Sequence, residues 1–359
     1  MQSRWIGPRW TPLLVVVLSL VGIALVPLTI GRDAASYDWL TGRVGGSGVY
    51  TLNLVFARAV PFIIAASIGI AVWQRLRGRS RDSIADGQVH RHDKTTVFAH
   101  WVNGLSMIAC LITAMWFVRW FERPFEVETL YLLHFIFAAL VLAMVAHHAT
   151  FQMALGGDGL KPRGGKDFQM AAAETFGYAG VFSKQRSFLG LGMPLALRRP
   201  IQRFVVRTLG IRPGEEDKYL ASERVLSYAI WTILIGVVVI TGVLKSARYV
   251  MPIPDGALRA ATFLHDGAMV WIIALLFIHV AAIVLIPLNL PLLKSMLTTR
   301  ISLDYVSKHL PIWYRRLEAE NPGLQSAVAP TESNRPATTV AGPSSSQQTA
   351  TPNPGPAGV

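Results

Sequence analysis

Six long apolar runs constrain this chain more than any other feature of its sequence. A helix needs about 20 mostly apolar residues to cross the roughly 30 Å hydrocarbon core of a bilayer. Six stretches reach that length, at about 12–30, 53–74, 96–118, 130–150, 226–246 and 264–290. Only 15% of the residues are charged, against about 25% in an ordinary soluble domain. The sequence therefore predicts an all-α integral membrane protein with six spans, and it argues against a soluble enzyme.

The distribution of Lys and Arg predicts which side of the membrane each connection faces. The connections expected on one side, among them 1–11 and 294–320, carry 25 of these residues, whereas the alternating connections carry seven. Basic connections stay in the cytoplasm, so both termini are expected there, with the chain in the cytoplasmic (inner) membrane of a bacterium. The net charge of +13 is thus divided among loops, which argues against a nucleic-acid-binding surface.

The sequence divides the chain into three parts. Residues 1–93 are expected to form a two-helix extension with a basic loop, although Arg4 and Arg9 before the first run also suit a signal peptide. Residues 94–318 form the main domain, and its long cytoplasmic insertion covers 151–225. Residues 319–359, rich in Pro, Ser, Thr and Gly, are predicted to be a disordered tail.

One part of the insertion alternates arginines with bulky apolar residues. Residues 198–212 read RRPIQRFVVRTLGIR. This pattern predicts either an amphipathic helix on the cytoplasmic leaflet or a solvated connector.

The placement of the nine histidines carries most of the functional information. An ionisable residue at membrane depth is costly and is a functional candidate by default, although a single one is equally well explained as an interhelical hydrogen-bonding group. Six lie in or at the ends of apolar runs: His100, His134, His147, His148, His265 and His279. The other three lie in polar segments and are expected to be solvated: His90, His92 and His309.

The spacing of His265 and His279 points to two haems. They are 14 residues apart on one span, which is about 21 Å along a helix and within about 40° in direction. Two haems stacked through a bilayer need this arrangement, with one axial histidine each from the shared helix. Cys110 is the only cysteine, and no C-x-x-C-H motif exists. Any haem is therefore held non-covalently, and cysteine-ligated iron–sulfur clusters are excluded from this chain.

Each haem then needs a second histidine at matching depth. His134 begins a span that runs inward, so it lies near the periplasmic face with His265. His100 begins a span that runs outward, so it lies towards the cytoplasm with His279. His148 is a rival, because it stands 14 residues after His134 on the same span and would complete a two-helix ligand set. Position alone does not decide whether His100 or His148 is the second ligand. If they are not ligands, His147 and His148 are interfacial residues at a helix end.

At these residues the chain resembles the cytochrome b (gamma) subunit of membrane-bound formate dehydrogenases, within the prokaryotic cytochrome b561-like group. The similar segments are AHWVNG at 99–104, LLHFIFAALVLAMV at 132–145, FLHDGAMVWIIALLFIH at 263–279 and MLTTRISLDYVSKHLPIWYRRL at 296–317. The resemblance implies a four-helix dihaem bundle at 94–318 whose two b haems are held by His100, His134, His265 and His279. It also implies a periplasmic iron–sulfur subunit, a separate catalytic subunit, and quinone reduction near the cytoplasmic face.

One segment departs from the family pattern. The family often has Lys-(aromatic)-Asn-Ala-Gly-Gln-Lys before its third haem-domain helix, with the Asn at the quinone. Here residues 218–224 read KYLASER, with Leu220 in place of that Asn. Ser222, Glu223 and Arg224 are therefore candidates for the quinone vicinity in an altered site. Glu223 either takes part in proton uptake or is a helix-start carboxylate paired with Arg224.

The sequence thus predicts a dihaem cytochrome b that carries electrons across the bilayer between an iron–sulfur partner and the quinone pool. The same scaffold also serves hydrogenases and sulfur-compound reductases, and formate enters from the resemblance alone. Two rivals from other classes are a haem-free, proton-coupled transporter that uses the histidines as a relay, and a structural anchor without quinone turnover.

Overall fold

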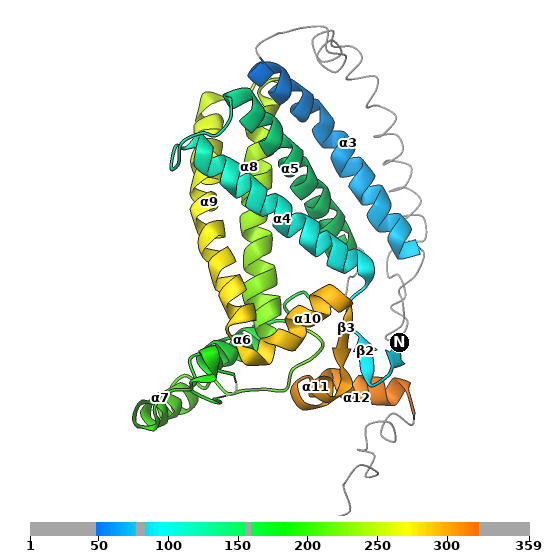
Figure 1. Ribbon diagram of the computed structural model, residues 1–359, viewed down its shortest axis with the longest axis vertical. Coiled ribbons are helices and arrows are strands. Elements are labelled where there is room, and N and C mark those ends of the chain that lie inside the picture. The colour runs from blue at the N-terminus through cyan, green and yellow to red at the C-terminus, as the bar shows by residue number, and fades with distance from the viewer. Residues whose placement is uncertain (1–47, 77–82, 155–158, 185, 323–359) are drawn as a thin grey trace, which may run out of the picture.

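The computed structural model describes residues 48–76, 83–154, 159–184 and 186–322. Within them, five helices are long and apolar enough to cross a membrane. They are α3 (Gly48–Leu76), α4 (Lys94–Phe117), α5 (Val127–His148), α8 (Ile230–Ala247) and α9 (Asp255–Val284). Figure 1 shows them as one elongated bundle. Five of the six predicted spans are thus confirmed as helices, whereas the first run, 12–30, and most of the 319–359 tail lie outside the described residues.

The helix ends follow from local sequence. α9 begins at Asp255, well before the predicted start, and ends at Val284, just ahead of the predicted terminator Pro287. Pro287 instead opens the short 3₁₀ turn η4 (Pro287–Asn289), because proline has no N–H to continue an α-helix. Two spans continue as π-helices, η1 (Ala149–Ala154) after α5 and η3 (Glu223–Ala229) before α8.

Apolar side chains hold the helices of the bundle together. Met107 and Leu111 of α4 pack with Met269 and Ile272 of α9, and Val141 of α5 joins the same cluster. A second cluster binds α3 to α5: Phe56, Val60 and Leu142, with Phe56 stacked on Phe135. The cores lie between the helices, so each span keeps one face towards its neighbours.

The outward faces of the spans are apolar as well. Large side chains stand exposed along α8 and α9, including Ile240, Phe263, Trp271 and Phe277. A helix that is apolar all round, with its outer face uncovered, is typical of a membrane span. The chain is therefore a multi-pass membrane protein.

The remaining elements gather at one end of the bundle (Figure 1). They are α6 (Gly165–Tyr178), η2 (Phe188–Gly190), α7 (Leu195–Arg207), α10 (Leu290–Thr298), α11 (Leu303–His309), α12 (Pro311–Glu320) and a small sheet. The described parts of the connections 75–95, 151–225 and 294–320, which were predicted to face the cytoplasm, lie at this end. α7 confirms a helix within the arginine-rich segment 198–212, while its place on the leaflet stays a prediction.

The small sheet departs from the all-α prediction. Its strands β1 (Ile84–Ala85), β2 (Gln88–His90) and β3 (Arg300–Ser302) are antiparallel in the order β1-β2-β3. Val89 pairs with Ile301, and both pack into a buried cluster around Trp313. Strands of two or three residues are too short to show a periodic pattern, so they could not be predicted from the sequence. The sheet joins the start of α4 to the segment that follows α10.

Candidate functional site

One histidine pair lies at the end of the bundle nearest the extramembrane elements. The His100 ring of α4 faces the His279 ring of α9, with centroids 6.4 Å apart and planes tilted by 48°. Trp101 Nε1 donates a hydrogen bond of 2.8 Å to the carbonyl of Met296, which fixes the start of α4 against α10. Trp231 of α8 meets the His279 ring edge-on at 6.3 Å. Three spans therefore converge on this pair.

The other two predicted ligands lie towards the opposite end, each held by a threonine of the preceding span. Thr113 Oγ1 of α4 is 2.8 Å from His134 Nδ1, and Thr241 Oγ1 of α8 is 3.1 Å from His265 Nδ1. Both hydroxyls also contact carbonyls of their own helices, at 2.9–3.0 Å for Thr113 and 2.6 Å for Thr241. His134 and His265 are close enough to interact electrostatically.

These threonine contacts assign the tautomer of both rings. Each hydroxyl directs its hydrogen to a helix carbonyl, so its oxygen accepts the Nδ1–H of the histidine. The Val238 carbonyl, 3.0 Å from His265 Nδ1, can only accept and requires the same proton there. Nε2 then keeps its lone pair in both His134 and His265. A neutral imidazole with a free Nε2 and an anchored Nδ1 is the state that binds a metal.

The histidine geometry fits a haem iron. A metal–imidazole bond of about 2 Å puts two rings on opposite sides of one iron with centroids about 6 Å apart, close to the separation of the His100 and His279 rings. Two axial histidines are the ligands that a b-type porphyrin leaves for the protein. Gly242 of α8 lies so close to the His265 ring that an added Cβ would stand 3.0 Å from its Cε1. The absence of a side chain at Gly242 therefore leaves space for the His265 imidazole.

His147 and His148, at the predicted helix end, contact other groups. His147 Nε2 is 2.8 Å from Gln74 Oε1 of α3, and its ring stacks on Phe151. The His148 ring lies 5.4 Å from that of Tyr228 in η3. His148 therefore meets a tyrosine, whereas His100 meets the ring of His279, and this contrast favours His100 in the choice that the sequence left open.

The three histidines expected to be solvated are not on the open surface. His92 is buried, with 5% of its surface exposed, and burial followed by the charges of Arg91 and Lys218 holds its pKa well below the usual range. His90 and His309 are half-buried, His90 because it lies in β2. The prediction was wrong for His92, because the sheet contact that buries it joins segments distant in sequence.

The segment KYLASER starts the α8 span, and carboxylates cap its first free N–H groups. Leu220 N donates to Glu223 Oε2, Ala221 N to Glu216 Oε2 and Ser222 N to Glu174 Oε2, each at 2.9 Å. The first N–H groups of a helix have no partner within it, and its dipole favours negative charge there. Three carboxylates thus meet at one helix start, two from the adjoining segment and one, Glu174, from α6.

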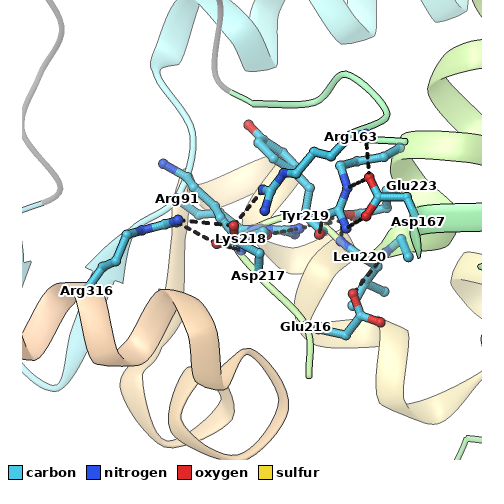
Figure 2. Close-up of polar contacts among 12 residues, drawn as sticks. Arg91, Arg163, Asp167, Glu216, Asp217, Lys218, Tyr219, Leu220, Glu223 and Arg316 are labelled. Carbon is cyan, nitrogen blue, oxygen red and sulfur yellow. Dashed lines mark hydrogen bonds and ion pairs between the residues drawn. The ribbon is translucent and has the colours of Figure 1, made fainter. Parts of the chain in front are cut away.

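The ion pairs at this end differ from the predicted one. A pair with Arg224 was one of the two roles predicted for Glu223, but Glu223 pairs with Arg91 of the segment before α4, at 3.0 Å. Arg224 instead binds Asp167 of α6 through two hydrogen bonds of 2.7 and 2.8 Å. Figure 2 shows Arg91 and Glu223 among these contacts, together with Asp167. Glu223 and Arg224 are neighbours in this π-helix but bind different partners. Their adjacency in the sequence therefore does not predict their ion pairs.

The three candidates for the quinone vicinity therefore have different surroundings. Ser222 and Arg224 are buried, and Arg224 is held by Asp167. Glu223 keeps 24% of its side chain exposed and lies within electrostatic range of His279. Of the three, Glu223 is therefore the one that a ligand beside the His100–His279 pair could reach.

Several residues of the site escaped the sequence prediction. Thr113 and Thr241 carry a weak signal, a hydroxyl inside an apolar span. Arg91, Asp167 and Glu174 carry none, because they stand in ordinary polar segments and reach the site only through the tertiary fold.

A comparison with known families agrees with this geometry. A family model described as prokaryotic cytochrome b561 matches residues 91–299, more than half of the chain. The matched range begins directly after β2, ends directly after α10 and contains both histidine pairs. No curated protein matches the chain, and no solved structure matches it.

Proposed function

The chain belongs to the prokaryotic cytochrome b561 family, a membrane family of haem b electron carriers, and from that premise we propose a specific role for it. It is the dihaem membrane subunit of a respiratory oxidoreductase similar to formate dehydrogenase. It receives electrons from an iron–sulfur subunit outside and delivers them to quinone near the cytoplasmic face. Substrate oxidation takes place on a separate catalytic subunit.

The observation that carries the proposal is the presence of two histidine pairs at two depths of one bundle. His100 and His279 would hold one haem, and His134 and His265 the other. Bound haem supplies reversible one-electron chemistry at its iron. The protein holds each ring in place, keeps Nε2 unprotonated through the Nδ1 contacts, and surrounds both sites with apolar helices that exclude water.

Glu223 supports a quinone at the inner end. Its partly exposed carboxylate lies beside Arg91 and near His279, where a quinone that accepts electrons from the inner haem also needs protons. Electrons moving inward and protons taken up from the inside would together separate charge across the membrane. The buried Arg91 guanidinium holds Glu223 in position.

Haem content tests this function directly. Purified full-length chain, expressed with ample haem, is expected to show a b-type reduced-minus-oxidised spectrum and about two haems per chain by pyridine haemochrome. Co-purification should recover an iron–sulfur protein, and formate should then reduce the haems. A colourless chain would support the transporter or the anchor instead. If hydrogen or a sulfur compound reduced the haems and formate did not, the cytochrome assignment would stand. The partner would then be a hydrogenase or a sulfur-compound reductase in place of a formate dehydrogenase.

The threonine contacts make a graded prediction. Thr113→Val removes the one hydrogen-bond acceptor that the described residues offer to His134 Nδ1, whereas Thr241→Val leaves the Val238 carbonyl for His265. A weaker Nδ1 hydrogen bond makes the imidazole a poorer electron donor, which destabilises ferric iron. Both variants should keep their haem and raise the outer haem's midpoint potential, Thr113→Val by more.

Redox titration followed at the α band measures this shift. Thr150→Val is the matched control, because among the described residues the Thr150 hydroxyl bonds the Ala146 carbonyl alone, at 2.8 Å. Unchanged potentials in both Thr113→Val and Thr241→Val would contradict the assigned role of the threonines.

A further inference from the structure

A cavity of about 210 Å³ lies beside α6, at the end of the bundle that holds the inner histidine pair. Apolar side chains line it on several sides, among them Met170, Phe182 and Pro213. Its charged lining groups are Glu174, Glu216 and Arg186. The haem and quinone assignments above make no use of this cavity, yet two acidic side chains reach it from different segments.

Glu174 and Glu216 are both buried, with 5% and 2% of their surfaces exposed. One oxygen of each accepts a backbone N–H at the start of η3, from Ser222 and Ala221. Glu174 Oε1 is also buried and has no hydrogen-bond partner among the described residues. Two carboxylates cannot donate to each other, so their contact becomes a hydrogen bond only when one of them carries a proton.

The surroundings place that proton on Glu216. Burial, then the hydrogen bond to Glu174 and the charge of Glu174, raise the pKa of Glu216 to about 9, against smaller opposing effects from the Ala221 N–H and Arg224. The other titratable groups around the pair are Arg186 in the cavity wall, Tyr178 on α6 and Tyr305 on α11. We therefore expect Glu216 to carry a proton at neutral pH.

Polar groups continue from this pair towards the inner histidines. Ser222, whose N–H binds Glu174, has its hydroxyl 3.2 Å from Tyr178 Oη. Tyr178 is in electrostatic contact with both Glu174 and Glu223. Glu223 in turn lies near His279. The order from the cavity inwards is thus Glu216, Glu174, the Ser222–Tyr178 hydroxyls and Glu223.

We propose that the Glu174–Glu216 pair is the proton-loading site for quinone reduction, filled from the cytoplasm through the cavity. The proposal rests on the proposed function. Quinone takes two electrons from the haems and two protons to become quinol, and the electrons come from the iron–sulfur donor. One of the protons leaves Glu216 and passes through the hydroxyls to Glu223. The pair then holds two adjacent negative charges, which draw the next proton from cavity water.

Glu216→Gln tests the proposal. Glutamine keeps the size of the side chain and a donor towards Glu174 but has no proton to release. In nanodiscs, chemically reduced haems should still be reoxidised by a water-soluble quinone, about a hundredfold more slowly than in the parent chain at neutral pH. Haem content should be unchanged. Glu215→Gln is the matched control, since the neighbouring Glu215 is exposed and binds Arg315 at the surface.

An infrared titration gives a readout that needs neither haem nor quinone. The parent chain should lose a protonated-carboxyl band as the pH rises through about 9, and Glu216→Gln should lack that band. Glu174→Gln removes the neighbouring charge, so the band should disappear at a lower pH.

The outcomes separate this inference from the function on which it rests. A haem-loaded Glu216→Gln variant that reduces quinone at the parent rate would overturn the proton-loading role alone. A parent chain without a protonated carboxyl at neutral pH would overturn it as well. A colourless parent chain would overturn the cytochrome assignment first, and this inference with it.

Discussion

Replacement of His279 by alanine is expected to lower the haem content from about two to about one per chain. The imidazole has no substitute, because the ring that faces it belongs to His100, the other proposed ligand of the same haem. His100→Ala should lose the same haem, so the two variants should share one residual spectrum. Pyridine haemochrome and redox titration of the purified variants measure the loss.

His148→Ala is the control that decides between the two ligand sets. His148 contacts Tyr228, so its removal should leave both haems in place. If His148→Ala loses a haem while His100→Ala keeps both, the inner ligand comes from α5, and the two-helix pattern replaces the present assignment. Retention of both haems in His279→Ala would refute the inner site altogether.

The parts of this protein that repeat along a helix could be predicted from the sequence. Apolar runs of sufficient length predicted the five described spans, because a membrane allows few other structures for them. The 14-residue interval between His265 and His279 is a helical period, so it predicts a shared face without any tertiary information. The pairing of His100 with His279 was open on position alone, and it is the closeness of their rings that supports it.

The polar contacts at the start of the α8 span could not be predicted in this way. Arg91 and Glu223 are 132 residues apart, and Arg224 and Asp167 are 57 apart. The sheet, with its two- and three-residue strands, brings Arg91 to the start of α8, and no local pattern marks it. The expected Glu223–Arg224 pair came from adjacency in the sequence, whereas the π-helix η3 directs those side chains to separate partners.

Arg224→Leu is expected to be the most destabilising single change at this end of the molecule. The guanidinium binds both oxygens of Asp167, and the two side chains are only 2% and 6% exposed. Removal of one partner from a buried pair leaves the other charge uncompensated, which costs about 3 kcal/mol or more of the free energy of unfolding. SDS titration followed by circular dichroism measures this loss. Limited proteolysis should cut the segment around α6 faster.

The double variant Asp167→Asn/Arg224→Leu separates the uncompensated charge from lost packing. It should recover much of the stability that Arg224→Leu loses, because no buried charge remains. Arg315→Leu is the surface control: its pair with Glu215 is more than half exposed on both sides, so no measurable change is expected. A double variant no more stable than Arg224→Leu would show that packing, rather than charge, joins α6 to α8.

The Arg224–Asp167 ion pair also makes the free energy of unfolding depend on pH in the acid range. The hydrogen bond from Arg224 holds the pKa of Asp167 below its usual range. A carboxyl with a lowered pKa stabilises the fold above its unfolded value, about pH 4, and this contribution is lost as the pH falls through the lowered value. Glu216 acts in the opposite sense, because its raised pKa favours the fold at low pH and opposes it as the pH rises towards about 9. Arg224→Leu lacks this contribution at every pH, so its stability should fall less than that of the parent chain as the pH drops below about 4, whereas Glu216→Gln should flatten the decline of stability as the pH rises towards about 9.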